Sequence, residues 1–157
     1  MATLIKPPIY DEYSNPSIFL AGSIDMGSAV DWQTQVYEAL KDEQVTIFNP
    51  RRDDWDSSWE QSINNPKFKE QVVWELEHLE SADLVVFYFD VNGPAPITLL
   101  ELGLFAVDIE QHSVVCCPEG YWRKGNVDIV CERYGINQVK DLSELITFIK
   151  EWIHELR

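Results

Sequence analysis

Short apolar segments alternate with longer amphipathic segments along the chain. The apolar segments are rich in Val, Ile, Leu and Phe, which predicts buried strands at residues 17–21, 45–48, 84–89 and 114–117. The amphipathic segments repeat their apolar positions every three or four residues, which predicts helices at residues 29–42, 68–79, 98–109, 126–134 and 142–156, with a small strand near Gln138. This alternation predicts an α/β fold with a parallel sheet and helices on both faces, in a single domain over residues 1–157.

The composition and net charge of the chain limit the kinds of partner that we expect it to bind. The 157 residues carry a formal net charge of -15, and 45% of them are hydrophobic, as in an ordinary globular protein. Such an acidic surface repels phosphate backbones and anionic lipid headgroups, so we expect neither nucleic acid nor a membrane as partner. A small molecule held by a few local donors fits this charge.

The cysteines and the first residues indicate a compartment. The first thirteen residues (MATLIKPPIYDEY) lack the basic start and apolar run of a signal peptide, and no apolar run approaches the ~20 residues of a membrane span. Three cysteines without framework spacing favour reduced thiols. We therefore expect a cytoplasmic protein, and the scattered histidines predict no metal site or other cofactor.

The loops that follow the four strands, residues 22–28, 49–66, 90–97 and 118–125, should meet at the carboxyl edge of the sheet, where such folds bind ligands. Gly22 and Ser23 are candidates to reach a ligand through backbone N–H groups and a hydroxyl. Their segment, GSIDMGS, does not fit the G-x-G-x-x-G pattern, and Asp25 and Asp31 disfavour a nucleotide phosphate.

Glu101 is the first candidate for chemistry, and its spacing allows two interpretations. Thr98 and Glu101 form a T-x-x-E pattern that is typical of a helix capping box. Alternatively, Glu101 is a carboxylate in the first helical turn that stays ionised and faces the crevice, as nucleophilic attack at an anomeric carbon requires. Asp90 and Glu75 are candidates for the second, proton-donating carboxyl group.

The arginine pair and three tryptophans also leave alternatives open. Asn49 begins the segment NPRR, in which Arg51 and Arg52 either position a substrate or hold the acidic loop at residues 53–56 through ion pairs. Tryptophans at positions 32, 55 and 59 either stack on a nucleobase or pack in the core.

Several segments, in their order and spacing, resemble the nucleoside 2-deoxyribosyltransferase family, most closely its shorter branch that carries NPRR. They are residues 19–24 (FLAGSI), 32–33 (WQ), 49–52 (NPRR), 74–75 (WE), 82–84 (ADL), 96–98 (PIT) and 101–103 (ELG). The resemblance extends from about residue 18 to 126. It implies a flavodoxin-like fold, a homo-oligomer, and transfer of deoxyribose between nucleobases by double displacement, with a nucleoside and a free nucleobase as partners.

The resemblance also implies roles for individual residues. Glu101 matches the nucleophilic glutamate of the E-L-G motif, and Glu75 matches an acidic active-site residue that is usually aspartate. Asn126 matches an asparagine that enters a neighbouring subunit's site, so active sites would be shared between chains.

The chain departs from the better-known branch in two places. Where that branch has a base-contacting aspartate, six residues before the nucleophile, this chain has Ala95, so Asp90 or Asn92 would have to substitute. Where it has an early tyrosine in its first strand, this chain has Ile18.

Two other functions stay open. A hydrolase of the same superfamily would use water in the second step, and Arg51 and Arg52 would let it accept a nucleoside 5′-monophosphate. A non-catalytic nucleoside- or nucleotide-binding module is the third reading, because fold does not fix function.

Overall fold

The computed structural model describes residues 1–25 and 29–157, and residues 26–28 of the predicted ligand loop lie outside that description. Its sheet has six strands, all parallel, in the order β1-β3-β2-β4-β5-β6. The strands are β1 (Thr3–Ile5), β2 (Ser17–Gly22), β3 (Thr46–Phe48), β4 (Leu84–Tyr88), β5 (His112–Cys116) and β6 (Asn137–Val139).

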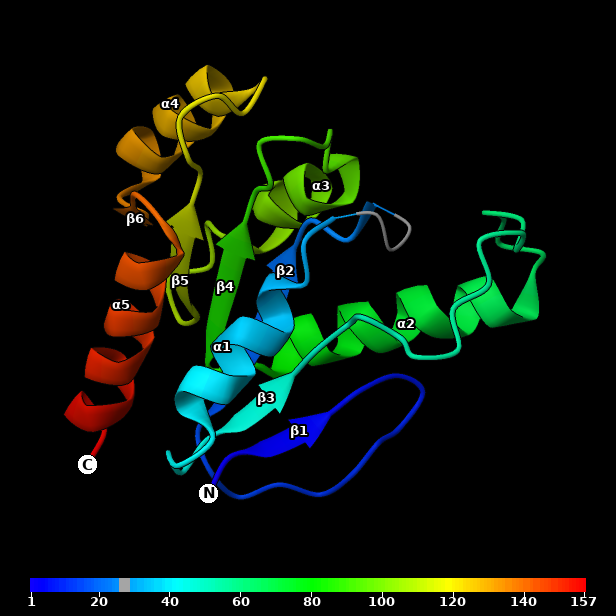
Figure 1. The fold of residues 1–157 in the computed structure, drawn as a ribbon, viewed down its shortest axis with the longest axis horizontal. Coiled ribbons are helices and arrows are strands. Elements are labelled where there is room, and N and C mark those ends of the chain that lie inside the picture. The colour runs from blue at the N-terminus through cyan, green and yellow to red at the C-terminus, as the bar shows by residue number, and fades with distance from the viewer. Residues whose placement is uncertain (26–28) are drawn as a thin grey trace.

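In the described residues, five helices cover the two faces of the sheet (Figure 1). They are α1 (Trp32–Leu40), α2 (Pro66–Ser81), α3 (Pro96–Phe105), α4 (Lys124–Tyr134) and α5 (Leu142–Glu155). One apolar cluster joins the sheet to α1 and α5, and the other joins it to α2, α3 and α4. The outer half of α2 and the loop before it extend away from the sheet (Figure 1). None of the helices in the described ranges has the length and apolar character of a membrane span.

The strand order confirms the predicted flavodoxin-like fold. Leaving β1 aside, the chain builds the sheet in the order second, first, third, fourth and fifth strand, so the direction of winding reverses between β2 and β4. These two strands pair along their whole length, from Ile18 opposite Leu84 to Gly22 opposite Tyr88. The crevice of the fold therefore opens where β2 and β4 end.

The structure differs from the sequence-based prediction mainly at element boundaries. Strand β1 was not predicted, because it is short, lies at the edge of the sheet beside β3, and buries only Ile5 fully. Helix α1 begins later than expected because Asp31 caps it, with its carboxylate accepting from the N–H of Thr34 (3.1 Å). Helix α3 begins at Pro96 and ends at Phe105, where a helix from 98 to 109 was expected.

Gly22 ends β2 at the reversal point, and its lack of a side chain is required there. A Cβ atom at this position would lie 2.3 Å from Cζ2 of Trp32 and 2.7 Å from the carbonyl oxygen of Tyr88. Because the indole is fully buried and the carbonyl belongs to a central strand, neither can move away cheaply.

We therefore expect Gly22→Ala to lower the free energy of unfolding by about 2–3 kcal/mol through overpacking. The matched control is Gly103→Ala in α3, where a Cβ would meet nothing within 4 Å and where alanine should stabilise the helix by roughly 0.5–1 kcal/mol. Urea denaturation of both variants measures this, and a Gly22→Ala protein as stable as wild type would contradict the close packing at the reversal point.

Candidate active site

Ser23 and Asp90 join the ends of β2 and β4 at the reversal point. The Ser23 N–H donates to the carbonyl of Tyr88 (3.0 Å), and the Asp90 N–H donates to Ser23 Oγ (2.8 Å). The two carboxylate oxygens of Asp90 accept from the backbone N–H groups of Asn92 (2.9 Å) and Val30 (3.3 Å). Asp90 is buried, so its carboxylate fastens the loops that meet here.

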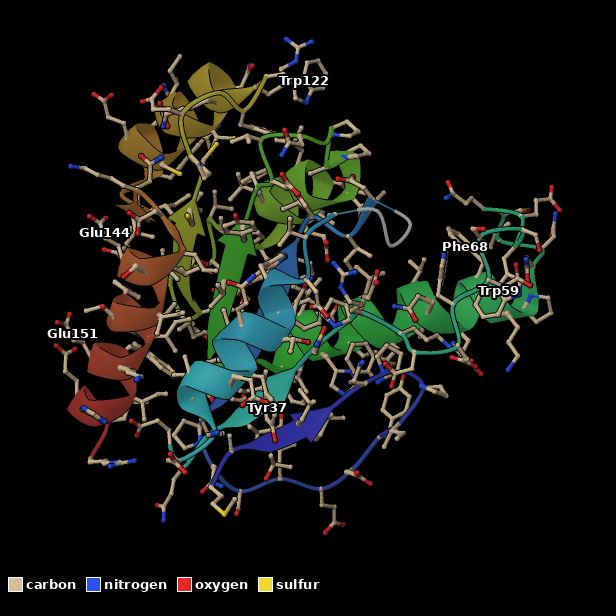
Figure 2. The ribbon with its side chains drawn as sticks, in the orientation of Figure 1. Tyr37, Trp59, Phe68, Trp122, Glu144 and Glu151 are labelled. Carbon is tan, nitrogen blue, oxygen red and sulfur yellow. The ribbon has the colours of Figure 1, made fainter. Side chains whose placement is uncertain are left out.

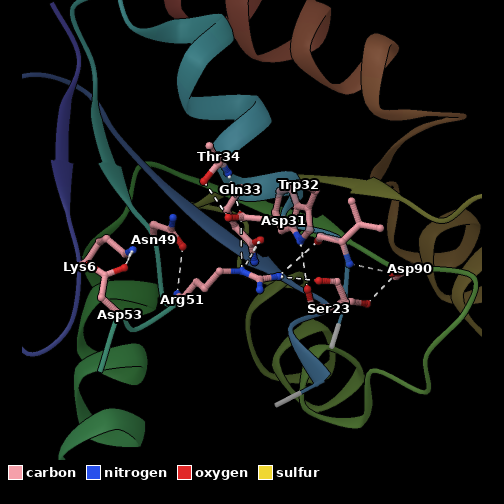
Figure 3. A network of polar contacts seen from close by, with 12 residues as sticks. Lys6, Ser23, Asp31, Trp32, Gln33, Thr34, Asn49, Arg51, Asp53 and Asp90 are labelled. Carbon is pink, nitrogen blue, oxygen red and sulfur yellow. Dashed lines mark hydrogen bonds and ion pairs between the residues drawn. The ribbon is translucent and has the colours of Figure 1, made fainter. Parts of the chain in front are cut away.

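Arg51 holds the segment that leads into α1 (Figure 3). Its Nε donates to Gln33 Oε1 (3.3 Å) and lies 3.5 Å from Asp31 Oδ1. Its Nη2 donates to the carbonyl oxygens of Ala29 (3.2 Å) and Val30 (3.3 Å). The guanidinium of Arg51 is thus engaged with the loop after β2, not with the acidic loop at residues 53–56.

Arg52 holds that acidic loop, as one of the two interpretations of the arginine pair predicts. Its buried guanidinium pairs with Asp54 (2.6 Å) and with Glu70 on α2 (2.8 Å), and it lies 5.3 Å from the ring of Trp59. Bonding to Arg52 lowers the pKa of Asp54. Arg52 therefore fixes the loop to the outer part of α2.

Asn49 directs the chain after β3. Its N–H donates to the carbonyl of Ile5 (3.0 Å), and its side-chain oxygen accepts from the N–H of Arg51 (3.0 Å), which forms a local turn. Asn49 is buried at the carboxyl edge, close to the end of β2 through the pairing of β2 with β3. The structure therefore brings Gly22, Ser23 and Asn49 to the same edge.

The three tryptophans do not form a base-stacking platform at this edge. Trp32 is fully buried and stacks on Tyr88 with ring centroids 4.9 Å apart, so it packs in the core and cannot stack on a nucleobase. Trp55 and Trp59 contact each other edge to face at 5.1 Å, and Figure 2 places Trp59 at the outer end of α2.

The capping-box interpretation of Thr98 and Glu101 is wrong. The helix begins earlier, at Pro96, and its cap position is Ala95, which has a left-handed backbone (φ 43°) and no polar side chain. Asp25 reaches this helix start from the loop after β2, where its Oδ1 accepts from the Ala95 N–H (3.3 Å). Thr98 is buried in the first turn, and Glu101 lies in the turn after it.

Glu101 faces Glu75 across the space between α3 and α2. Glu101 is only 8% exposed, and burial together with the negative charge of Glu75 raises its pKa well above the usual range of a carboxyl group. Burial also raises the pKa of Glu75, to about 7. Glu101 thus lies beyond the first turn in which it was expected, and its pKa is shifted in the direction opposite to the one expected from the helix dipole. Both shifts favour a proton on this pair of carboxyl groups near neutral pH.

Gln71, one helical turn before Glu75, is a further polar residue of this region that sequence analysis missed. Its Nε2 donates to Glu75 Oε1 (2.8 Å) and to the carbonyl oxygen of Pro50 (2.9 Å), and this bond to Glu75 lowers the pKa of Glu75 against the effect of burial. The signal that could have identified it is the spacing of four residues on one helix, which places side chains next to each other.

Asn92 and Asn126 are both exposed near the same edge. Asn126 lies in the first turn of α4, which begins at Lys124, two residues before the expected start of this helix. In the loop before α4, Tyr121 and the exposed Trp122 both donate to the carbonyl of Pro94 (2.7 and 3.2 Å), which fixes the segment before α3.

Two cavities, of about 500 and 280 Å³, open at the opposite, amino-terminal edge of β4 and β5. Residues that line both include Asp108, Gln111 and His112.

In the described ranges no three His, Cys, Asp or Glu residues are grouped so as to hold a metal ion. The geometry thus offers carboxyl chemistry, with Glu75 and Glu101 near the carboxyl edge.

The raised pKa values predict how stability depends on pH. A carboxyl group whose pKa is higher in the folded state binds more protons there, so stability falls as pH rises from its unfolded pKa through its folded pKa. For Glu75 this window runs from 4.5 to about 7. Glu101→Gln removes one of the two repelling charges. The free energy of unfolding of this variant minus that of wild type should therefore be larger at pH 8 than at pH 5, by on the order of 2 kcal/mol.

Urea denaturation at both pH values measures this difference, and Glu80→Gln, at an exposed position on α2, is the matched control. A stability difference between Glu101→Gln and wild type that is the same at pH 5 and pH 8 would contradict the shared proton.

The chain is similar to known proteins in fold and in family. A solved structure described as a conserved protein from Enterococcus faecalis V583 is similar in fold, with a TM-score of 0.58 and 16% sequence identity over 88% of this chain and 99% of that one. The search of curated proteins gives no match. The family model described as nucleoside 2-deoxyribosyltransferase like matches residues 15–121, a range that includes Glu75 and Glu101. The chain therefore belongs to the nucleoside 2-deoxyribosyltransferase-like family.

Proposed function

We propose that the protein transfers the deoxyribosyl group of 2′-deoxyribonucleosides from one nucleobase to another through a covalent intermediate on Glu101. The observation that carries this proposal is the pair formed by half-buried Glu75 and buried Glu101, two carboxyl groups with raised pKa values on two helices inside the region that matches the family. A pair of carboxyl groups with one proton provides a nucleophile and an acid, as in retaining glycosidases.

The reaction balances without a metal or an organic cofactor. In the form of the pair in which Glu75 carries the proton and Glu101 is ionised, an oxygen of Glu101 attacks C1′ while the C1′–N bond breaks, and the departing base takes the proton of Glu75 at nitrogen. A second base then attacks C1′ from the side that the first base left, which releases Glu101, and the proton of the incoming base returns to Glu75. Two displacements give net retention at C1′.

Glu75 is a better acid than Asp90 on geometry. Both oxygens of Asp90 accept backbone N–H groups that hold the loops, so a proton there would compete with these bonds. Glu75 accepts one bond, from Gln71 at Oε1. Asp90 is therefore proposed as a residue that holds the loops around the substrate.

The substrate class is a nucleoside, not a nucleoside 5′-monophosphate. Asp25 lies at the start of α3, where a helix N-terminus would otherwise favour an anion. Arg51, which could offset that charge, is already bonded to Asp31 and Gln33. Gly22, Ser23, Asn49 and Asn92 are proposed to contact the nucleoside because they lie at the same edge.

Base exchange tests the proposal. Incubation with deoxyinosine and free adenine should form deoxyadenosine, and Glu101→Gln should lower kcat/KM by at least about 1,000-fold, because a nucleophile is lost. Glu80→Gln should match wild type. Release of free deoxyribose at a rate that added adenine does not change would instead indicate a hydrolase, and absence of both products would favour a binding module.

We further propose that the chain forms a homo-oligomer through the outer face of α3. Ile97, Leu100, Leu104 and Val107 follow one another at helical spacing and are between 47 and 58% exposed. A helix that is apolar on all sides is normally buried. We propose that a second copy of this chain covers the surface. Each copy has a net charge of -15, and contact through an apolar surface keeps the acidic side chains of the two copies away from each other. Asn126, exposed at the start of α4, would then reach the neighbour's site.

Leu100→Glu tests this surface. A buried unpaired charge at the seam should raise the dissociation constant of the oligomer by at least about 100-fold, which sedimentation equilibrium measures. Ile63→Glu, at an exposed apolar position in the loop before α2, is the control and should leave assembly unchanged. A Leu100→Glu protein that assembles like wild type would place the interface elsewhere.

We also propose a cytoplasmic location. Cys116, Cys117 and Cys131 are free and buried, and burial raises the pKa values of their thiols to about 12, 11 and 11. Free thiols are typical of a reducing compartment.

A further inference from the structure

Gln71 connects Glu75 to the loop that follows β3. Its side chain is buried on α2, and its Nε2 group has two hydrogens. One is donated to the carbonyl oxygen of Pro50 (2.9 Å) and the other to Oε1 of Glu75 (2.8 Å). The amide therefore links the helix that carries one carboxyl group of the pair to the N-P-R-R segment.

The orientation of this amide is fixed by Pro50. A backbone carbonyl can only accept, so the amide nitrogen, not the amide oxygen, must face Pro50. Turning the amide over would place its oxygen against two acceptors, Pro50 O and Glu75 Oε1, and both bonds would be lost. Oε1 of Gln71 itself has no hydrogen-bond partner among the described residues, so the two N–H bonds alone hold the side chain.

An N–H donor at Oε1 of Glu75 distinguishes the two oxygens of that carboxyl group. The donor stabilises electron density on Oε1, and a carboxyl oxygen that carries a proton is a poor acceptor. The proton of Glu75 is therefore favoured on Oε2. We propose that Gln71 is a positioning residue that makes Oε2 of Glu75 the oxygen that gives its proton to the departing base and takes it back from the incoming one.

The assignment rests on the proposed transferase function and deepens it. Among the described groups near Glu75, Gln71 is the one that donates a hydrogen bond to this carboxyl group. Glu101 on α3 is the group whose pKa the negative charge of Glu75 raises, and in the described structure it donates no hydrogen bond to Glu75 that would orient it. The loop after β3 carries Arg51 and Arg52, but their guanidinium groups are bonded to Asp31 and to Asp54 and Glu70.

The most direct variant is Gln71→Met, which keeps the length of the side chain and removes both N–H donors. Without a donor the ionised form of Glu75 is less stable, so its pKa rises and the acid stays protonated to higher pH. The basic limb of the pH profile of kcat/KM should therefore move up by at least about half a pH unit. In addition, kcat should fall by about tenfold or more, with little change in the affinity for the nucleoside, because the proton is no longer directed.

A readout that does not need activity accompanies the pH profile. The carboxyl ¹³C resonance of Glu75, assigned by its loss in Glu75→Gln, should titrate near pH 7 in the wild type and at higher pH in Gln71→Met. Gln71→Glu is a second variant, in which a third carboxyl group should raise the pH at which Glu75 titrates still further. Gln35→Met, at an exposed position on α1, is the matched control and should change neither readout.

Unchanged pH limbs and an unchanged Glu75 titration in Gln71→Met would overturn the proposal, even if the rate fell, because a purely structural role would lower the rate at all pH values alike. If wild type showed no base exchange, the proposed function would fail, whereas the ¹³C titration would still decide whether Gln71 sets the protonation of Glu75.

Discussion

The placement of two carboxyl groups close to each other, half-buried Glu75 on α2 and buried Glu101 on α3, is the constraint on which the site depends. Each group alone would lose its hydration on folding, and together they also repel, so the pair is tolerated near neutral pH by retaining a proton. Such an arrangement costs stability and is typical of places where a protein needs a proton to move. The rest of the carboxyl edge keeps the two helices in this arrangement.

That support comes from the point where the sheet reverses its winding. The absence of a side chain at Gly22 lets Trp32 pack against the end of β2, and Ser23 and Asp90 join the ends of β2 and β4. The loops that follow these strands are held at several points. Arg51 bonds the segment before α1, and Asp25 bonds the start of α3. The two carboxyl groups thus approach each other from separate crossovers over one rigid sheet.

The sequence was sufficient for the architecture because each central strand is an apolar run and most helices have a regular apolar stripe. It was insufficient for β1, whose three residues beside a proline-rich segment give no such signal. At α3 the local pattern was misleading. The spacing of Thr98 and Glu101 suits a cap, but Pro96 starts the helix one residue after a left-handed Ala95, so both side chains turn toward the interior. The bonds of Arg51 and Asp25, and that of Gln71 to Pro50, join segments distant in sequence, and no local pattern predicts them. The spacing of Gln71 and Glu75 on one helix is the local signal that was available.

A trapped sugar on Glu101 tests the central claim most directly. The protein is incubated with a 2′-deoxyribonucleoside without an acceptor base, quenched in acid, digested, and examined by mass spectrometry. We predict a deoxyribosyl adduct on the peptide that contains Glu101, at the glutamate itself, and its disappearance when adenine is added before the quench. Turnover of the nucleoside with that peptide unmodified, or with the adduct on another side chain, would contradict the assignment of Glu101 as the nucleophile.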